Sequence, residues 1–486
     1  IDWKISVAGR TDETANSAGL FNSSVTPFVF PDSKGMPVFH ALENASSEVL
    51  ISVYLLDHRE IVSLLMMLLE KGVSVTILLE GSPGGGVPDA EIRYMNALHE
   101  KGANVFIMKG NGVYKRYDLV HNQYAVIDSG RVIVTSENWR EQSFNGNRGW
   151  GAVIDSRAYA EYMRNIFFAD CDAARYDVFR LKELYQNIAP ISVPAYKPKP
   201  PAQYASFSSY VRPVLSPDFS LDHLRYGMMN ASSRIYTEQM SIQYAWTDTT
   251  IQSPLSWSLT AARNGADVRV LADVTFDADD GGANNYSVAA AINNWGDMQA
   301  RTISGGDNFG LMHNKGVIID DTVWISSINW TNAAFMNNRE VAVEIHSKDV
   351  ADYYAEYFLL DWGCEAEMRF SVSVKGNTAG EVILFDASSS SFPKGTVFGW
   401  DLDGDGIIER TGIMIAAVLP EGVHECMLTA TDPSGSTYEY RFTVTVYPKG
   451  AGSAFYEPYI KYTPILAIML MILVVTVIIR ARGGRE

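Results

Sequence analysis

Two stretches of the chain carry the same pattern of polar residues, and this repetition limits what the chain can fold into. They are LVHNQYAVID, residues 119–128, and LMHNKGVIID, residues 311–320. In each stretch a His-Asn pair precedes an apolar run that ends in Asp. One copy alone would be a weak signal. Two copies in equivalent contexts indicate a tandem repeat of one folding unit, with a composite site built from both copies.

The repeat extends beyond these stretches on both sides. Upstream, Asn-Ala-Ser-Ser precedes a strand-like segment at residues 44–47 and again at residues 230–233. Downstream, the matched residues are Ser136 and Ser327, Asn138 and Asn329, Trp139 and Trp330, Asn147 and Asn338, and Arg148 and Arg339. The first copy has one extra residue at Ser129-Gly130, which is typical of a longer hairpin turn.

Each copy alternates helical segments with apolar, β-rich runs. In the first copy, for example, the helical pattern EIVSLLMMLLEKG is followed by the strand pattern VSVTILL. This alternation predicts α/β lobes, each with a mostly parallel buried sheet. We expect lobe 1 at residues 36–185 and lobe 2 at residues 204–365, with an irregular lead-in at residues 1–35 and a Pro-rich linker at residues 186–203.

The second copy has the spacing HxKxxxxD, followed by Ser-x-Asn and then by Asn-x-Glu. In these residues it resembles the phospholipase D superfamily, and the resemblance covers residues 36–365. It implies two tandem phospholipase-D-like α/β lobes related by a pseudo-twofold axis, with both histidines facing one phosphate. It also implies a phosphohistidine intermediate that forms without a cofactor or a metal ion.

The chemistry of a phosphodiester explains these residue types. Residues two apart on a strand project to the same face, so His313 and Lys315 are expected side by side. An imidazole can attack phosphorus while an ammonium group stabilises the negative charge that builds up. We expect His313 to be the nucleophile, Lys315 to bind the phosphate, and His121 to act as general acid and base. The family more often places the nucleophile in the first motif, so the exchanged assignment stays open.

The resemblance assigns further residues to the site by position. Asn138, Asn329 and Gln123 are expected to contact the phosphate, and Glu340 is expected to orient a histidine. The two motif aspartates, Asp128 and Asp320, are expected to be structural and to hold the loop after each strand.

The first copy departs from the family pattern at two positions. Gln123 stands in place of the lysine, and Gly149 stands where the second copy has Glu340. On this basis His313 has both a phosphate clamp and an orienting carboxylate, whereas His121 has neither. Two alternatives follow: an active site with weakened phosphate affinity, which we favour, or a decayed first half in a membrane-tethered binding module.

Two basic residues shortly before His121 offer a replacement for the missing charge. They are Lys115 and Arg116, in the run VYKRYDLVH. The alternative, which we favour, is that both are solvated loop residues.

Residues 366–448 change to period-two strands, a pattern typical of a small β-sandwich. The runs FDAS, WDLDGDG and ATD resemble the PKD domain, an immunoglobulin-like module of cell-surface proteins. Asp401, Asp403 and Asp405 also mimic the start of a calcium-binding loop. Because the twelfth position is Gly412 and not Glu, we favour a β-turn and keep calcium as the weaker alternative.

The last part of the chain is apolar and ends in basic residues. The apolar run predicts a transmembrane helix at residues 464–480. We expect a stalk before it at residues 449–463 and a short tail after it at residues 481–486. Arg480, Arg482 and Arg485 place that tail in the cytoplasm by the positive-inside rule. We therefore expect a single-pass protein of the cell membrane with most of the chain outside.

Net charge and membrane attachment together bear on the substrate. The formal net charge of −17 argues against a broad nucleic-acid surface. The sequence therefore favours a phosphodiesterase or transphosphatidylase that acts on phospholipids. A nuclease of the same superfamily and a surface-binding module are the alternatives. Head group, the choice between hydrolysis and transfer, and oligomeric state are not determined by the sequence.

Overall fold

The computed structural model of the protein describes residues 19–110, 112, 114–246, 253–275, 284–305, 309–363, 372–387, 390, 396–431 and 437–449. The chain divides into two compact units, Ile1–Glu367 and Met368–Glu486. The division falls close to the boundary that the sequence predicts between residues 365 and 366. Each unit is described by itself.

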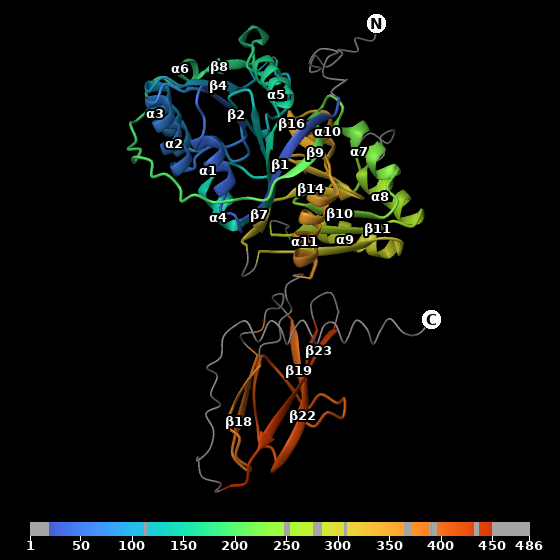
Figure 1. The fold of residues 1–486 in the computed structure, drawn as a ribbon. Coiled ribbons are helices and arrows are strands. Elements are labelled where there is room, and N and C mark those ends of the chain that lie inside the picture. Colours follow the sequence, from blue (N-terminus) through green and yellow to red (C-terminus); the bar gives the residue numbers. More distant parts are fainter. Residues whose placement is uncertain are drawn as a thin grey trace. The chain divides into compact units, whose positions relative to one another are not determined.

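The first unit contains two lobes with the same order of elements (Figure 1). Lobe 1 consists of β1 (Phe21–Phe30), α1 (Met36–Glu43), β2 (Glu48–Val53), α2 (Arg59–Glu70), β3 (Ser74–Glu80), α3 (Asp89–Glu100), β4 (Asn104–Met108), β5 (Gln123–Ile127), β6 (Arg131–Thr135), α4 (Glu141–Gly146), β7 (Asn147–Asp155), α5 (Arg157–Asp170), β8 (Val178–Arg180) and α6 (Leu181–Leu184).

Lobe 2 repeats this order from β1 to α5, with the two-residue strand β13 added. It consists of β9 (Phe207–Ser216), α7 (Ser220–Met229), β10 (Arg234–Gln239), α8 (Pro254–Arg263), β11 (Asp267–Asp273), α9 (Asn285–Trp295), β12 (Gln299–Ile303), β13 (Leu311–Met312), β14 (Lys315–Ile319), β15 (Thr322–Ser326), α10 (Asn332–Met336), β16 (Glu340–His346) and α11 (Lys348–Gly363). The expected tandem pair of α/β lobes is therefore present.

One continuous sheet runs through both lobes, in the order β12-β11-β10-β14-β15-β16-β9-β1-β7-β6-β5-β2-β3-β4-β8. Within it, β2, β3 and β4 are parallel, as are β10, β11 and β12. The other neighbours in this order are antiparallel. The prediction of a mostly parallel sheet is therefore wrong. The prediction relied on apolar strands being parallel. Strands joined by hairpins, such as β5 and β6, are as apolar as the strands joined by helices, because helices cover the sheet over both kinds of strand.

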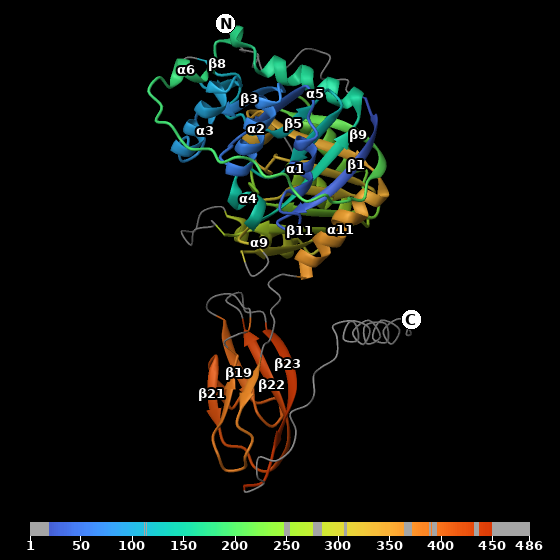
Figure 2. The same ribbon diagram turned by 60° about the vertical axis from the view of Figure 1, so that its left-hand side comes forward.

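The centre of the sheet is β1, which lies within residues 1–35, where the sequence predicts an irregular lead-in strand and loops outside the lobes. β1 pairs with β7 over Ser24 to Phe30 and with β9 over Phe21 to Val25, and so joins the lobes. Polar residues at its start and Pro27 within it hide the alternation, although the strand is buried from Val25 onward. Figure 2 shows β1 and β9 side by side.

The histidine segment of each lobe reaches across to the other lobe. The backbone N–H of His121 donates to the carbonyl of Arg339 over 2.8 Å, and that of His313 donates to the carbonyl of Arg148 over 2.9 Å. Arg148 lies on β7 and Arg339 directly precedes β16, so each segment docks beside the equivalent strand of the opposite lobe. This exchange is the structural basis of a composite site.

The linker between the lobes is an extended strap over lobe 1. Residues 188–206 form no helix or strand, as the proline content predicts. Tyr196 donates to Glu43 of α1 over 2.7 Å, and the hydroxyl of Tyr204 lies 2.7 Å from Nδ1 of His40. The strap therefore closes the apolar core beneath α1 (Figure 1).

The second unit is a β-sandwich. Its strands are β17 (Ser373–Lys375), β18 (Ile383–Asp386), β19 (Val397–Asp401), β20 (Arg410–Thr411), β21 (Met414–Ala417), β22 (Gly422–Thr431) and β23 (Thr437–Val446). One sheet has the order β17-β18-β21 and the other β20-β19-β22-β23. Trp400, Phe385 and Leu428 are buried between them.

The predicted transmembrane helix at residues 464–480 lies outside the described residues, as do most of the predicted stalk and the tail. Within the part of the chain that the structure describes, no helix has both the length and the apolar composition that a membrane crossing requires.

Candidate active site

Buried carboxylates at the ends of two equivalent strands fix the approach to each histidine. Glu80, at the end of β3, accepts the backbone N–H of Val120 over 2.7 Å. Asp273, at the end of β11, accepts the backbone N–H of Met312 over 3.0 Å. In each lobe the residue just before the histidine is thus tied to the carboxyl end of a parallel strand, where α/β proteins place their ligand sites.

The two motif aspartates lie away from the histidines and bind the loop before β2 or β10. Asp128 accepts the backbone N–H groups of residues 46, 47 and 48, and Asp320 accepts those of residues 232, 233 and 234. These hydrogen bonds to the charged form lower the pKa of each carboxyl to about 2, against the opposing effect of burial. This geometry matches the structural role expected for both.

The carboxylate that contacts His121 comes from the opposite lobe. Nδ1 of His121 lies 2.7 Å from Oε2 of Glu340. Glu340 also accepts from Ser327 over 2.6 Å and from Asn338 over 2.9 Å, so its side chain is held from three sides. Because a carboxylate accepts at Nδ1, the ring proton is held there and the lone pair is left on Nε2.

This contact corrects the expectation that Glu340 orients His313 and that His121 lacks a partner. The expectation assumed that each histidine pairs within its own repeat. Because the His121 segment crosses to pair with Arg339, Glu340 at the start of β16 lies beside His121.

His313 has a different set of neighbours at Nδ1. The carbonyl of Ser136 lies at 3.1 Å, Oε2 of Glu137 at 3.4 Å and Nζ of Lys315 at 3.0 Å. Burial, followed by the charge of Lys315, lowers the pKa of His313, and Glu137 opposes this shift. His313 therefore favours the neutral imidazole, with two acceptors and one cation at the same nitrogen.

Lys315 lies beside His313, as the strand geometry predicts, and is buried. Its ammonium also contacts the backbone carbonyl of His313 and lies 3.8 Å from Sδ of Met240. Burial lowers its pKa to about 8, although Glu137, Glu340 and Asp273 favour the charged form. The charge that the sequence assigned to phosphate binding is therefore close to neutralisation at mildly alkaline pH.

The two expected amide contacts of lobe 1 bind each other. Nε2 of Gln123 donates to Oδ1 of Asn138 over 2.7 Å. In lobe 2, Oδ1 of Asn329 is buried and has no hydrogen-bond partner among the described residues. An unpaired buried amide oxygen is a position where a ligand hydroxyl or water would be stabilised.

The two basic residues before His121 are neither solvated nor part of the histidine pair. Lys115 forms an ion pair with buried Glu80 at 2.8 Å. Arg116 is buried and pairs with Asp177 at 3.0 Å. They anchor the loop that carries His121, so the preference for solvated residues is wrong, and neither supplies the charge that Gln123 lacks.

A pair of buried arginines frames the site, and sequence reasoning gave them no role. Arg339 binds Asp170 of lobe 1 and Asp218 of lobe 2, each at 2.9 Å. Arg148 binds Asp361 of lobe 2 at 2.7 Å and contacts Asp32 of lobe 1. Each arginine ties the two lobes together behind a histidine. The sequence did contain a signal for these two arginines, because they occupy equivalent positions in the two repeats.

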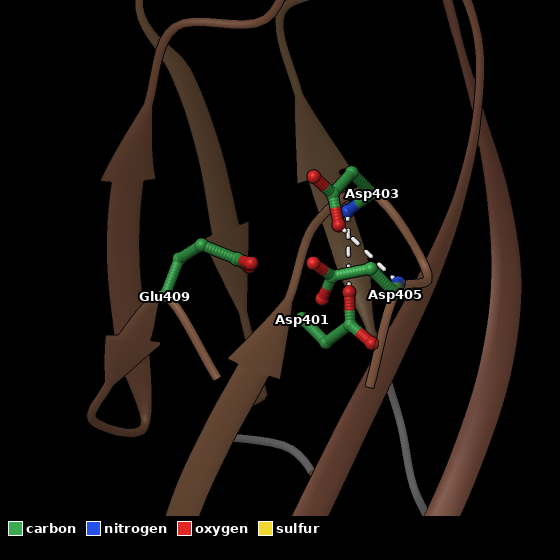
Figure 3. Close-up of side chains that lie close together, drawn as sticks. All are labelled: Asp401, Asp403, Asp405 and Glu409. Atoms are coloured by element: carbon green, nitrogen blue, oxygen red, sulfur yellow. Dashed lines mark hydrogen bonds between the residues drawn. The ribbon is translucent and has the colours of Figure 1, made fainter. Parts of the chain in front are cut away.

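The described part of the second unit brings together four carboxylates. Figure 3 shows Asp401, Asp403, Asp405 and Glu409 around one turn, with ligand atoms within 4.8 Å of one another. The backbone N–H groups of Gly404 and Gly406 donate to Asp401, and that of Leu402 donates to Glu409. The carboxylates therefore hold the turn itself, as the favoured interpretation expects, and calcium binding stays the weaker, untested alternative.

Two lobes that share a sheet and each place a histidine beside a buried carboxylate define a protein of the phospholipase-D-like class. A family model described as "Cardiolipin synthase, PLD-like domain" matches residues 38–171 and 227–362. Because these matches cover more than half of the 486 residues, the chain belongs to this family. Members of this superfamily are phosphodiesterases and transferases.

One solved structure supports the same assignment of fold. The phosphatidylserine synthase of Haemophilus influenzae Rd KW20 is 14% identical with a TM-score of 0.52, over 72% of this chain and 89% of that one. Nuc from Salmonella typhimurium, a phospholipase D family member, is 26% identical over 32% of this chain and 93% of that one, with a TM-score of 0.27. No curated protein matches the chain. The first of these similarities supports the fold alone.

Proposed function

We propose that the protein is a phosphodiesterase or transphosphatidylase that acts on phospholipids through a phosphohistidine intermediate. The observation that carries this proposal is the pair of histidines, each beside a buried carboxylate, in a site assembled from both lobes. A decayed binding module would have no need to keep a carboxylate beside each imidazole.

The contacts favour His121 as the nucleophile. Glu340 at 2.7 Å holds the ring proton on Nδ1, so the Nε2 lone pair is available to attack phosphorus. As the bond from Nε2 to phosphorus forms, the bond from phosphorus to the leaving alkoxide breaks. This assignment reverses the one favoured from the sequence, because the orienting carboxylate belongs to the other histidine.

His313 then serves as the acid and base. Its pKa is low in the free site, but an anionic phosphodiester favours the protonated ring and attracts the ammonium of Lys315 away from Nδ1. The protonated ring gives its proton to the leaving alkoxide. In the second step His313 accepts a proton from water or an alcohol that attacks phosphorus, and the bond to His121 breaks.

The preference for phospholipids over nucleic acid is supported by the net charge of −17 and by the apolar segment at residues 464–480. A helix there would hold the site near lipid head groups, with the bulk of the chain outside the cell. The family description, which names a cardiolipin synthase, and the fold shared with a phosphatidylserine synthase are consistent with a lipid substrate.

The proposal is tested with the full chain reconstituted into vesicles of phosphatidylglycerol and phosphatidylcholine, with and without glycerol as acceptor. Head-group release or exchange is expected, and His121→Asn and His313→Asn should each remove it while remaining folded. Single-stranded DNA is assayed in parallel. Cleavage of DNA without reaction of lipid would identify a nuclease, and turnover of neither substrate would favour a binding module.

A further inference from the structure

We propose that Glu137 is the positioning carboxylate of His313 and replaces, from a different place in the repeat, the one that lobe 1 lacks at Gly149. The inference rests on the proposed role of His313 in catalysis. Its geometric part, the contact between Glu137 and His313, stands independently of any activity.

The first step is the pairing of carboxylate and imidazole in both lobes. Oε2 of Glu137 lies 3.4 Å from Nδ1 of His313, and Oε2 of Glu340 lies 2.7 Å from Nδ1 of His121. Both carboxylates are buried. Each carboxylate comes from the lobe opposite to its histidine. The two histidine–carboxylate pairs are therefore related by the pseudo-twofold axis, although Glu137 and Glu340 are not at equivalent positions of the repeat.

The second step is the hydrogen bond that holds each carboxylate. Asn147 donates to Oε2 of Glu137 over 3.0 Å, and Asn338 donates to Oε1 of Glu340 over 2.9 Å. Asn147 and Asn338 are equivalent in the repeat. Equivalent amides thus hold carboxylates that arise from non-equivalent positions.

The third step is the space at Gly149, the position equivalent to Glu340. A Cβ atom at Gly149 would lie 2.2 Å from Oε1 and 2.7 Å from Cγ of Glu137. The side chain of Glu137 therefore occupies the volume that a carboxylate at position 149 would use. In lobe 2 the position equivalent to Glu137 is Ile328, which is buried in the apolar core.

These observations describe an exchange of two residues. Lobe 2 combines an apolar residue at 328 with a carboxylate at 340, and lobe 1 combines a carboxylate at 137 with glycine at 149. Oε1 of Glu137 is buried and has no hydrogen-bond partner among the described residues. Within those residues, no hydrogen bond of the fold therefore depends on this oxygen. When substrate draws Lys315 away from Nδ1, Glu137 and the carbonyl of Ser136 are left as acceptors for the ring proton.

The test measures the pKa of each histidine in the full chain by imidazole C2–H exchange, followed peptide by peptide with mass spectrometry. Glu137→Gln should lower the pKa of His313 further, because a carboxylate favours the charged ring. The matched control Glu340→Gln removes the carboxylate that contacts the other histidine and should leave the pKa of His313 unchanged. An unchanged pKa of His313 in Glu137→Gln, or an equal fall in both variants, would overturn the assignment.

A double substitution tests the exchange itself. Glu137→Ile should lower the pKa of His313, and Gly149→Glu alone should fail to pack because of the overlap with Glu137. The combined variant Glu137→Ile with Gly149→Glu reproduces the lobe 2 arrangement and should return the pKa of His313 toward that of the natural chain. A folded double variant without this recovery would contradict the proposal, and if it does not fold, Glu137→Gln alone decides.

Turnover supplies a separate readout. Glu137→Gln should lower kcat by up to about 10⁴-fold, the loss that follows when a carboxylate that orients a catalytic histidine becomes an amide, with little change in KM. A chain without phosphodiesterase activity would end the proposed function but leave the titration of His313 as a valid test. Titrations that fail as described above, in an active enzyme, would end only this inference.

Discussion

Nδ1 of His121 in lobe 1 lies 2.7 Å from Oε2 of Glu340 in lobe 2, so the first histidine motif is completed by the second repeat. Neither lobe alone contains a histidine with its orienting carboxylate. The two copies are therefore interdependent, and a change in one lobe has its catalytic effect on the histidine of the other.

Substitution of Glu340 tests this crossing. Glu340→Gln should lower kcat by up to about 10⁴-fold through His121, because an amide in place of the carboxylate can no longer hold the ring proton on Nδ1 or stabilise the imidazolium. The measurement is the rate of phosphohistidine formation in single turnover. If Glu340→Gln slows only the release of the adduct, Glu340 acts on the acid–base step and our assignment of partners is wrong.

We expect activity to fall above about pH 8, because Lys315 loses its charge there. Burial lowers its pKa to about 8, so the charged clamp is lost above that pH and kcat/KM should fall by about tenfold per pH unit. Lys315→Arg should retain its charge and remove this limb of the profile. A limb that persists unchanged in Lys315→Arg would belong to another group.

The same shift has a consequence for stability. The pKa of Lys315 is about 8 in the folded chain and 10.5 in the unfolded chain, so the folded state disfavours the charged form. The resulting destabilisation is complete below pH 8 and is relieved between pH 8 and 10.5. Lys315→Met should therefore raise the free energy of unfolding at pH 7, by on the order of 3 kcal/mol. Denaturant titration at pH 7 and pH 10.5 should show a gain that shrinks at the higher pH.

Gln123→Lys should restore part of the missing phosphate clamp. Gln123 donates to Asn138 at the position of the absent lysine, so a lysine there would add a second cation to the site. We expect kcat/KM to rise by up to about tenfold, or ~1.4 kcal/mol, whereas Gln123→Met should lower it. Equal effects of both substitutions would show that charge at this position is not limiting.

Arg339→Met should be among the most damaging changes to the fold. It leaves Asp170 and Asp218 buried without their cation, a loss of about 3–5 kcal/mol for a broken buried pair. Arg157→Met breaks only an exposed helical pair and should not shift the unfolding midpoint measurably. Similar midpoints for the two variants would show that the lobes do not depend on this pair.

The arginine tail predicts the orientation of the chain in the cell membrane. Protease added to intact cells should release the portion before Tyr459, because residues 464–480 form the proposed span and Arg480, Arg482 and Arg485 favour the cytoplasm. Digestion of the tail in place of the bulk of the chain would reverse this topology.

The repeat made the lobes, the composite site and the neighbouring His313 and Lys315 predictable from sequence. The partners of the histidines were not, because alignment compares each residue with its own equivalent and the structure crosses the lobes. Glu137 was visible only as the variable residue of Ser-x-Asn. Its significance needs the volume at Gly149, which no spacing reveals. The central place of β1 was not predicted, because its polar residues and proline obscure a strand that neighbours stabilise from either side.

The most direct test of the central claim is to locate the covalent adduct formed with bis(p-nitrophenyl) phosphate, whose leaving group needs no proton. In His313→Asn, tandem mass spectrometry should find the adduct on His121, where it accumulates because the acid–base group for its release is absent. In His121→Asn, no adduct should form. An adduct on His313 in His121→Asn would reverse the roles of the two histidines, and the absence of an adduct from both variants and from the natural chain would contradict a phosphohistidine mechanism.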